Sequence, residues 1–181
     1  MKFAMGFATA TLLGILGMLG VIYTGRYDVA AGSGMHPLFA WALHTTMENS
    51  VRARAAAIAS PPDLPALATQ GFQDFDEMCA QCHGAPGKEA GEIGNGLSPK
   101  PPPLKDAAKR WSAPEIFWIV KNGVHMTGMP AFGPTHDDER IWAVVAFVRS
   151  LPTLTAEQYE ALQSDTTDVA KPHSHGGHEH Q

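Results

Sequence analysis

The two cysteines of this 181-residue chain lie three positions apart, and a histidine follows the second one directly, in the stretch Cys79-Ala-Gln-Cys82-His83. Thiolate and imidazole groups bind borderline and soft metals, and thiols also form covalent bonds with cofactors or with each other. Because the chain has no other cysteine, any chemistry that depends on a thiol must take place in this segment.

Three kinds of site use two cysteines at this spacing. A redox-active dithiol would need a strand, a helix and a second strand around it, and no alternating β-branched runs flank the motif. A structural zinc site would need four ligands, and His125 and His136 are too widely spaced to complete a set with two cysteines. Covalent attachment of a c-type haem remains: two thiols become thioethers, and the adjacent His83 reaches the iron.

From about Pro65 to Pro152 the sequence resembles the monohaem class I c-type cytochromes, on this motif and on the later segment NGVHMTGMPAFG. The resemblance implies one covalent haem c on Cys79 and Cys82, with His83 and Met129 as the axial ligands of the iron. Met129 is favoured because the family places its ligand directly before a proline. Met126 and His125 remain alternatives, and a haem with two histidine ligands would have a lower reduction potential.

The resemblance also implies two packing contacts. A proline carbonyl in the proline-rich segment GLSPKPPPL, either that of Pro102 or that of Pro103, should accept a hydrogen bond from the haem-ligating histidine. Gly71 and Phe75 should pack against the last helix of the fold, where Phe147 is the expected aromatic partner.

The pattern of apolar residues predicts an all-α fold. Helical spacing of apolar side chains precedes the motif and recurs from Asp137 to Leu151, where Pro152 ends the run. Ser112 and Glu115 form a capping pattern before another helix, which should stop at Gly123. Thr135 and Asp138 suggest a second capping box at the start of the last helix. The segment from Lys100 to Arg110 brings together four cations, Lys100, Lys105, Lys109 and Arg110, in a loop expected near the haem edge.

The amino-terminal sequence predicts a membrane anchor. Phe3 to Tyr23 carries no charge and would span about 31 Å as a helix, which matches the hydrocarbon thickness of a bilayer. A cleaved secretory signal is the alternative, since Val29-Ala30-Ala31 offers small residues for a peptidase, but signal cores are usually shorter. Lys2 favours a cytoplasmic amino terminus, so the rest of the chain would face the periplasm.

The expected organisation has four parts. Residues 1–25 are the anchor, 26–64 a juxtamembrane helix and linker, 65–152 the haem domain, and 153–181 a short helix and a tail. The juxtamembrane helix, about Met35 to Ile58, should lie on the membrane surface or against a partner. The short helix should begin at Thr155 and end near Gln163. The tail is interpreted as a disordered polar segment, with metal capture as the alternative, because it contains His173, His175, His178 and His180.

The charge of the chain limits the classes of molecule that it can bind. Acidic and basic residues nearly balance in the haem domain, which excludes a nucleic-acid binder. The four cations near the proline-rich segment could steer an acidic redox partner, or be ordinary solvated side chains.

The expected function is transfer of single electrons between redox proteins by a chain anchored once in the bacterial inner membrane. No catalytic residues and no small-molecule substrate are expected. Two alternatives stay open: a fixed haem subunit of a larger membrane oxidoreductase, and a haem protein in which Met129 detaches so that a small ligand binds.

Overall fold

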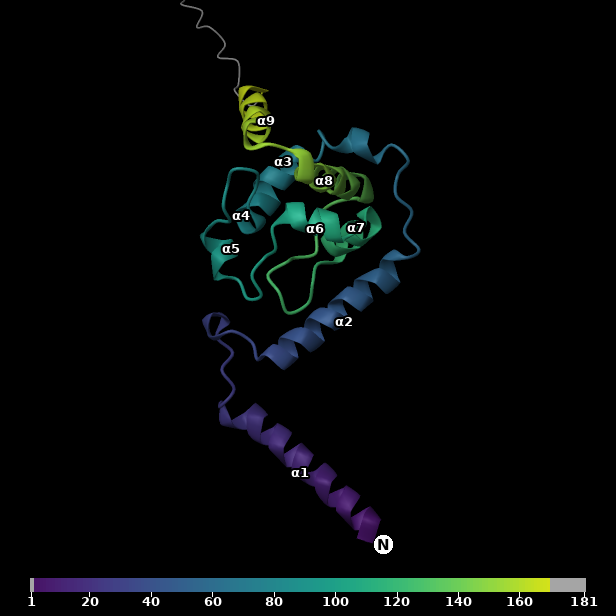
Figure 1. The fold of residues 1–181 in the computed structure, drawn as a ribbon, viewed down its shortest axis with the longest axis vertical. Coiled ribbons are helices and arrows are strands. Elements are labelled where there is room, and N and C mark those ends of the chain that lie inside the picture. Colours follow the sequence, from purple (N-terminus) through teal and green to yellow (C-terminus); the bar gives the residue numbers. More distant parts are fainter. Residues whose placement is uncertain (1, 170–181) are drawn as a thin grey trace, which may run out of the picture. The chain divides into compact units, whose positions relative to one another are not determined.

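The computed structural model describes residues 2–169, and every named element in that range is a helix (Figure 1). The predicted all-α fold is therefore confirmed. The chain divides into two compact units, residues 1–35 and the residues from His36 onward.

The first unit consists mainly of helix α1, Lys2–Thr24, which is followed by a single 3₁₀ turn, η1, at Ala31–Ser33. No residue of α1 is buried within the structure. Its most apolar window has a mean hydropathy of 2.0, and within residues 2–169 it is the one helix long and apolar enough to cross a membrane. The segment expected to span the bilayer is therefore helical over its whole length.

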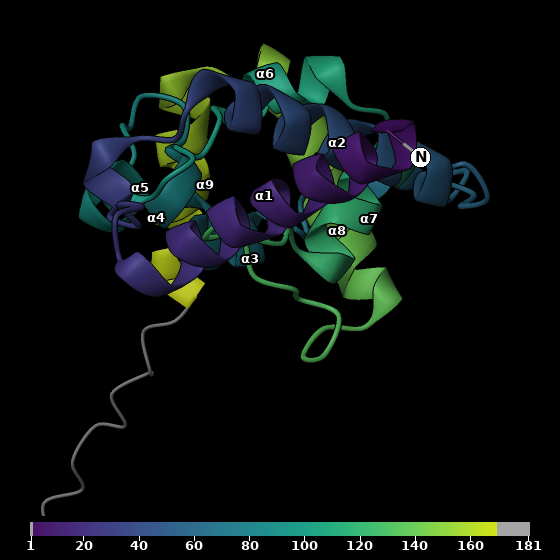
Figure 2. The ribbon, with the colours of Figure 1, turned by 90° about the horizontal axis from the view of Figure 1, so that it is seen from below.

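In the second unit several helices pack around α8, whose residues 141–148 are all buried (Figures 1 and 2). Helix α8 packs against η2, α7, α6 and α3, and α2 packs against α7. The segments α3, η3 and α4 follow one another without a break, so residues 72–83 form one helix with a π-helical turn in its middle. The elements in chain order are α2 (Pro37–Ala55), η2 (Leu64–Leu67), α3 (Phe72–Asp74), η3 (Phe75–Cys79), α4 (Ala80–His83), α5 (Glu92–Gly96), α6 (Leu104–Arg110), α7 (Ala113–Asn122), α8 (Asp138–Ser150), η4 (Leu151–Thr153) and α9 (Ala156–Val169).

An aromatic cluster joins the helix that carries the cysteines to the carboxyl-terminal helices. The rings of Phe75 and Phe147 lie 4.9 Å apart, so the expected contact between them is confirmed. Phe72 and Tyr159 complete the cluster, with the Tyr159 side chain fully buried. Edge-to-face and tilted aromatic pairs at such distances stabilise beyond the area they bury. The cluster therefore fixes the helix of residues 72–83 against α8 and α9.

Gly71 lies where the amino-terminal end of that helix crosses α8. A Cβ atom at this position would lie 2.0 Å from the backbone oxygen of Ala143, which is closer than any real contact. The two backbones therefore touch only because residue 71 has no side chain. The expected close crossing at Gly71 is confirmed.

The helix boundaries confirm one expected capping box and correct another. The side chains and backbone of Ser112 and Glu115 form the capping box at the start of α7. Asp137, however, is the residue that caps α8, because its carboxylate accepts from the backbone N–H of Arg140 at 2.9 Å. Thr135 belongs to the preceding turn, where its N–H and hydroxyl both donate to the Phe132 carbonyl. The prediction of a Thr135–Asp138 capping box was wrong for that reason.

Candidate functional site

Cys79 ends the π-helical turn and Cys82 lies one helical turn further on, so both side chains project from neighbouring positions on one helix. Cys79 is buried, Cys82 is half-buried, and the two sulfurs are not joined in a disulfide. Burial raises the pKa of the Cys79 thiol to about 12, and the nearby Asp74 carboxylate adds to the shift. A redox-active dithiol needs a thiol whose pKa is lowered instead, so these surroundings do not suit that alternative.

His83 ends the same helix, and one of its ring nitrogens forms a hydrogen bond within the protein. Its Nδ1 lies 2.8 Å from the carbonyl oxygen of Pro102. Because a carbonyl can only accept, Nδ1 carries the proton and Nε2 keeps a free electron pair. Burial lowers the pKa of the imidazole, opposed by the bond to Pro102, so burial favours the neutral form that binds metals. Of the two prolines predicted for this role, the structure selects Pro102.

The loop after His83 is wrapped tightly around the motif. Gly84 has a left-handed φ of 72°, and the N–H of Gly91 donates to the Gln81 carbonyl at 2.9 Å. A Cβ atom at Gly94 would lie 2.4 Å from the backbone oxygen of Cys82. Sequence analysis did not single out Gly94, and the glycine-rich run of residues 91–96 was the available signal. The glycines let the loop hold the cysteine-bearing turn in place.

The loop that carries Met129 is closed by its own hydrogen bonds. The Met129 N–H donates to the Thr127 hydroxyl at 3.1 Å, and this hydroxyl donates to the Val124 carbonyl at 2.8 Å. The Val124 N–H in turn donates to the Met129 carbonyl at 3.2 Å. Gly123, with φ of 66°, ends α7 as expected, and a Cβ there would clash with the backbone of residues 129–131. Thr127 therefore orients this loop, a role that sequence analysis missed.

The three ligand candidates of this loop differ in their surroundings. Met129 is half-buried and packs against the hydrophobic core. Met126 is 72% exposed and has a φ of 59°, a conformation rarely adopted by a residue with a side chain. His125 is exposed as well. Of the two methionines, only Met129 is therefore packed against the core to which the cysteine helix contributes.

A small cavity lies beside Cys79, and its walls are apolar except for one histidine. His136 lines this cavity; its Nε2 atom is buried and has no hydrogen-bond partner among the described residues, while Nδ1 lies 2.8 Å from the Thr135 hydroxyl. A buried polar atom without a partner is costly, and a water molecule or a bound group beside Nε2 would satisfy it. The walls consist of Met78, Cys79, Val120, Phe132, His136, Ile141 and Val144.

These features fit a haem group. Two neighbouring thiols, a neutral imidazole with a free Nε2 and a half-buried thioether are the donors that a c-type haem uses. Within residues 2–169, no three His, Cys, Asp or Glu side chains lie close enough to hold a metal ion together. The tail histidines of the sequence analysis lie outside the described residues.

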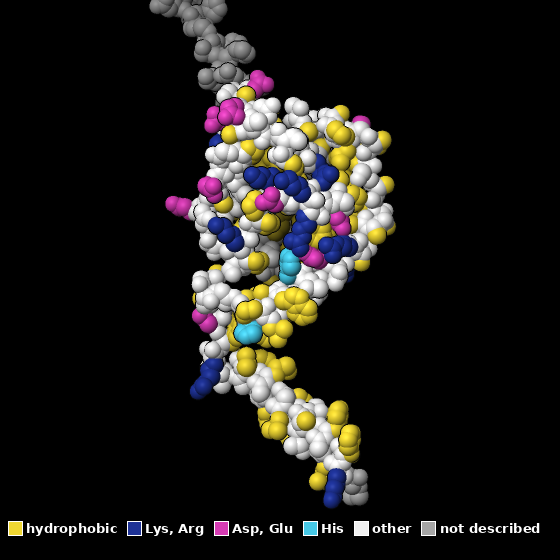
Figure 3. Space-filling model, in the orientation of Figure 1, with side chains coloured by type: hydrophobic (Ala, Val, Ile, Leu, Met, Phe, Trp, Pro, Cys, Tyr) yellow, Lys and Arg dark blue, Asp and Glu magenta, His cyan; other side chains and the backbone are white. Residues whose placement is uncertain are grey.

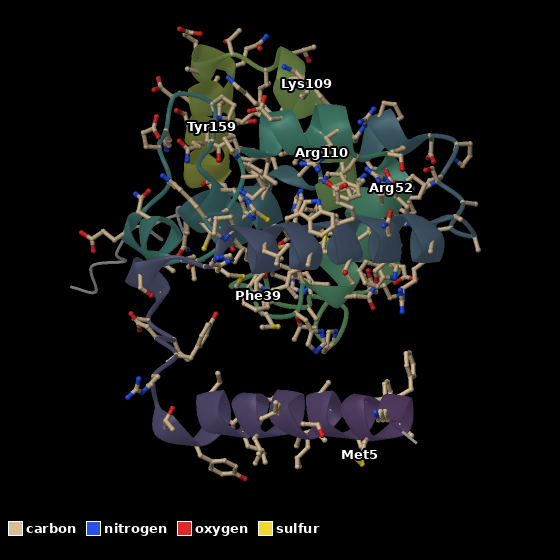
Figure 4. The ribbon with its side chains drawn as sticks, turned by 60° about the horizontal axis from the view of Figure 1, so that its bottom comes forward. Met5, Phe39, Arg52, Lys109, Arg110 and Tyr159 are labelled. Carbon is tan, nitrogen blue, oxygen red and sulfur yellow. The ribbon has the colours of Figure 1, made fainter. Side chains whose placement is uncertain are left out.

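The cationic cluster is built differently from the expectation. Lys105, Lys109 and Arg110 lie on helix α6, which the sequence analysis did not predict, instead of in an extended loop. Arg110 forms an ion pair with Glu48 of α2, so its charge is already paired within the protein. Figure 3 shows Lys and Arg side chains gathered around a recess on one face of the second unit, and Figure 4 labels Lys109 and Arg110.

Comparison with known proteins identifies one matching family. Residues 66–148 match the family described as cytochrome C oxidase, cbb3-type, subunit III. No curated protein matches the chain. The matched region begins one residue after the expected start of the haem domain and ends within α8, and it contains the cysteine motif and the methionine loop. It confirms the resemblance stated from the sequence.

Proposed function

We propose, from the membership of residues 66–148 in the c-type cytochrome family, that this chain carries one haem c, covalently bound through Cys79 and Cys82, and passes single electrons between redox proteins. His83 and Met129 would hold the iron from its two sides. The observation that carries the proposal is the bond from His83 Nδ1 to Pro102, which leaves Nε2 of a neutral imidazole available.

Each residue has a separate task in this function. The haem, when bound, supplies the one-electron couple of its iron. The Pro102 carbonyl orients the imidazole of His83 and fixes its tautomer, as second-shell partners of ligating histidines do. The hydrogen bonds of Thr127 hold the Met129 backbone in place. Because rigid elements support both ligands, little rearrangement accompanies a change of redox state.

The chain has no catalytic role of its own in this proposal. If His83 and Met129 both bind the iron, no position on it would be left for a substrate. The small cavity beside Cys79 has apolar walls apart from His136, and apolar surroundings of a haem would favour a higher potential. The chain is therefore an electron carrier whose partners are proteins.

The attachment is tested by replacing the thiols one at a time. We expect Cys79→Ala and Cys82→Ala each to remove one thioether, so that each single variant keeps a haem on one bond and the double variant loses covalent haem. Haem staining after denaturing electrophoresis and intact-mass measurement read this out. Covalent haem that survives in the double variant would contradict the proposal. Ser98→Ala, which changes a small polar residue outside the motif, is the control.

Helix α1 supports an anchor in a bacterial inner membrane, with the haem domain on the periplasmic side. Its length and hydropathy suit a membrane span, and the thioether chemistry of c-type haem belongs to the exported side. The partners would then be redox proteins in the same membrane or in the periplasm.

A second candidate function is a fixed haem subunit of a larger oxidoreductase, and the family description favours it because it names a subunit of an oxidase. Gentle detergent extraction of the native membrane separates the two. A fixed subunit would stay with partner subunits in constant ratio through size exclusion, whereas a tethered carrier would elute alone.

A further inference from the structure

Helix α2 differs sharply between its two halves. Its carboxyl-terminal half is joined to the haem domain: Val51 is fully buried, and the Arg52 guanidinium lies 5.5 Å from the centre of the Trp111 ring. Glu48 forms ion pairs with Arg110 of α6 and with Arg52. This half therefore moves with the domain as one body. Figure 4 shows Arg52 on this part of α2 and Arg110 beside it.

The amino-terminal half of α2 exposes large apolar side chains instead. Leu38 is 60% exposed, Phe39 54%, Trp41 65% and Leu43 41%. Residues 37–46 contain no Asp, Glu, Lys or Arg, whereas the charged residues of the helix all follow. Polarity thus changes along the helix axis and not around it. A helix whose surface faces water usually carries charged residues among its apolar ones, and residues 37–46 carry none.

The chain length before α2 limits what can cover this surface. Twelve residues, 25–36, separate the end of α1 from Pro37, and they can extend over at most about 43 Å. If α1 spans the membrane, Pro37 therefore stays within about 43 Å of the bilayer surface. Such a tether raises the effective concentration of lipid around α2. A weak intrinsic affinity of α2 for the bilayer is then sufficient for it to be bound most of the time.

The residue types suit the membrane interface. Trp and Tyr concentrate at the level of the lipid headgroups, because their rings are apolar and carry one polar group. Trp41 and Phe39 lie in the exposed half of α2, and Tyr23 and Tyr27 lie at the end of α1 and just after it. Aromatic residues thus lie around the start of the connecting segment and just after its end.

From these observations we infer that the amino-terminal two turns of α2, residues 37–43, insert into the headgroup region of the bilayer that α1 spans. The inference rests on the proposed anchor and adds a second point of attachment to it. The haem domain is then held at one distance and orientation from the membrane by α2, which restricts its electron exchange to partners at the same height. The occupant of the apolar surface is lipid.

Photo-crosslinking of the full-length haem protein in vesicles of phosphatidylethanolamine and phosphatidylglycerol tests this inference. One variant carries Trp41→p-benzoylphenylalanine. The matched control carries Ile93→p-benzoylphenylalanine, because Ile93 on α5 is equally exposed, at 65%. After irradiation, mass spectrometry of the peptides detects phospholipid adducts. We expect lipid adducts in the variant with the crosslinker at position 41 and none in the control with the crosslinker at position 93.

Three results would overturn the inference. Absence of any adduct at position 41, in protein that floats with the vesicles, would place this surface in water. A crosslink from position 41 to a second copy of the chain would make it a protein interface. Equal lipid adducts at positions 41 and 93 would show lipid contact without preference for α2. Flotation is measured on the same samples: protein that does not float refutes the anchor itself, and with it the proposed location.

Discussion

At the scale of single residues, chemically similar side chains differ in how well their surroundings suit them to bind a haem. Met126 and Met129 are three positions apart, yet one is exposed with a left-handed backbone and the other packs on the core. His83 and His125 are both histidines, and only His83 has a partner that holds its ring. The structure therefore ranks candidates that the residue types alone leave equal.

The first prediction concerns the methionine ligand. We expect Met129→His to lower the reduction potential of the haem and to abolish the weak red absorption band of the oxidised protein, because imidazole stabilises ferric iron more than a thioether does. Absorption spectra and a redox titration measure both changes. Met126→Leu should alter neither property. A red band that survives in Met129→His and disappears in Met126→Leu would assign the ligand to Met126.

The second prediction concerns Tyr159 at alkaline pH. Burial raises the pKa of its hydroxyl far above the ordinary value near 10, and the hydrogen bond to Asp76 adds to the shift. Above about pH 10 the unfolded chain releases this proton while the folded chain keeps it. The stability contributed by Tyr159 is therefore complete below that pH and is lost as the pH rises further.

Urea unfolding of wild type and Tyr159→Phe between pH 8 and 11 tests this pH dependence. We expect the variant to be less stable by about 1 kcal/mol at pH 8, from loss of the hydrogen bond to Asp76. The difference should shrink as the pH rises, because only the wild type loses stability through this hydroxyl. Other titrating groups cancel in the comparison. A difference that stays constant to pH 11 would show that the hydroxyl does not titrate differently on folding.

At the scale of elements, the cysteine helix is positioned by its neighbours. Residues 72–83 form one helix that begins at the Gly71 crossing and ends at His83. Asp74, on its first turn, accepts two hydrogen bonds from Arg140 of α8, at 2.5 and 2.6 Å. The aromatic cluster, the crossing and this bidentate ion pair hold one helix on another, so the site depends on the contact between these two elements.

The third prediction tests that contact. We expect Gly71→Ala to destabilise the folded protein by roughly 1 to 3 kcal/mol, the usual cost of overpacking, since its Cβ would meet the backbone of Ala143 and force the helices apart. Chemical unfolding of the haem protein provides the free energies. Gly96→Ala is the matched control, because a Cβ at position 96 meets no atom within 4 Å. Equal stability of the two variants would mean that the crossing adapts without cost.

At the scale of the whole molecule, the chain combines a helix suited to lipid with a helical domain suited to water. The first unit buries none of the α1 side chains, whereas α8 of the second unit buries residues 141–148 without interruption. The formal net charge of −5 is small for this length, so long-range attraction to one class of partner is weak. Location in the membrane would limit the choice of partners more than charge does.

The fourth prediction concerns the fate of α1. We expect protein from native membranes to have the intact mass of the full 19.4 kDa chain plus one haem, and to remain in the membrane after alkaline carbonate extraction, because about 31 Å of apolar helix is stable in the bilayer. Mass spectrometry and fractionation measure this. The mass of a chain that begins at Ala31 or at Gly32, together with release into the soluble fraction, would identify residues 1–30 or 1–31 as a cleaved signal. Leu13→Arg with Leu16→Arg should weaken retention and serves as the control.

Much of this protein could be predicted from its sequence because the signals are local. The motif at residues 79–83 needs only residue types and spacing, helices follow from the period of apolar residues, and the Ser112–Glu115 cap depends on residues of one turn. Local signals were weaker where neighbouring residues or segments suit more than one structure. Helix α6 was missed because it follows a proline-rich stretch, and Asp137 and Thr135 both have the composition of a cap.

By itself the sequence determined the all-α class, the apolar first helix and the similarity of residues 66–148 to a c-type cytochrome family, since each depends on pattern within a short stretch. The tertiary structure decided which proline carbonyl meets His83, which methionine of the loop faces the core, and which glycine, Gly94, lies against Cys82. These outcomes depend on segments 10 to 20 residues apart or more meeting in space. Spacing along a chain does not specify such distances, because they follow from how all the helices pack together.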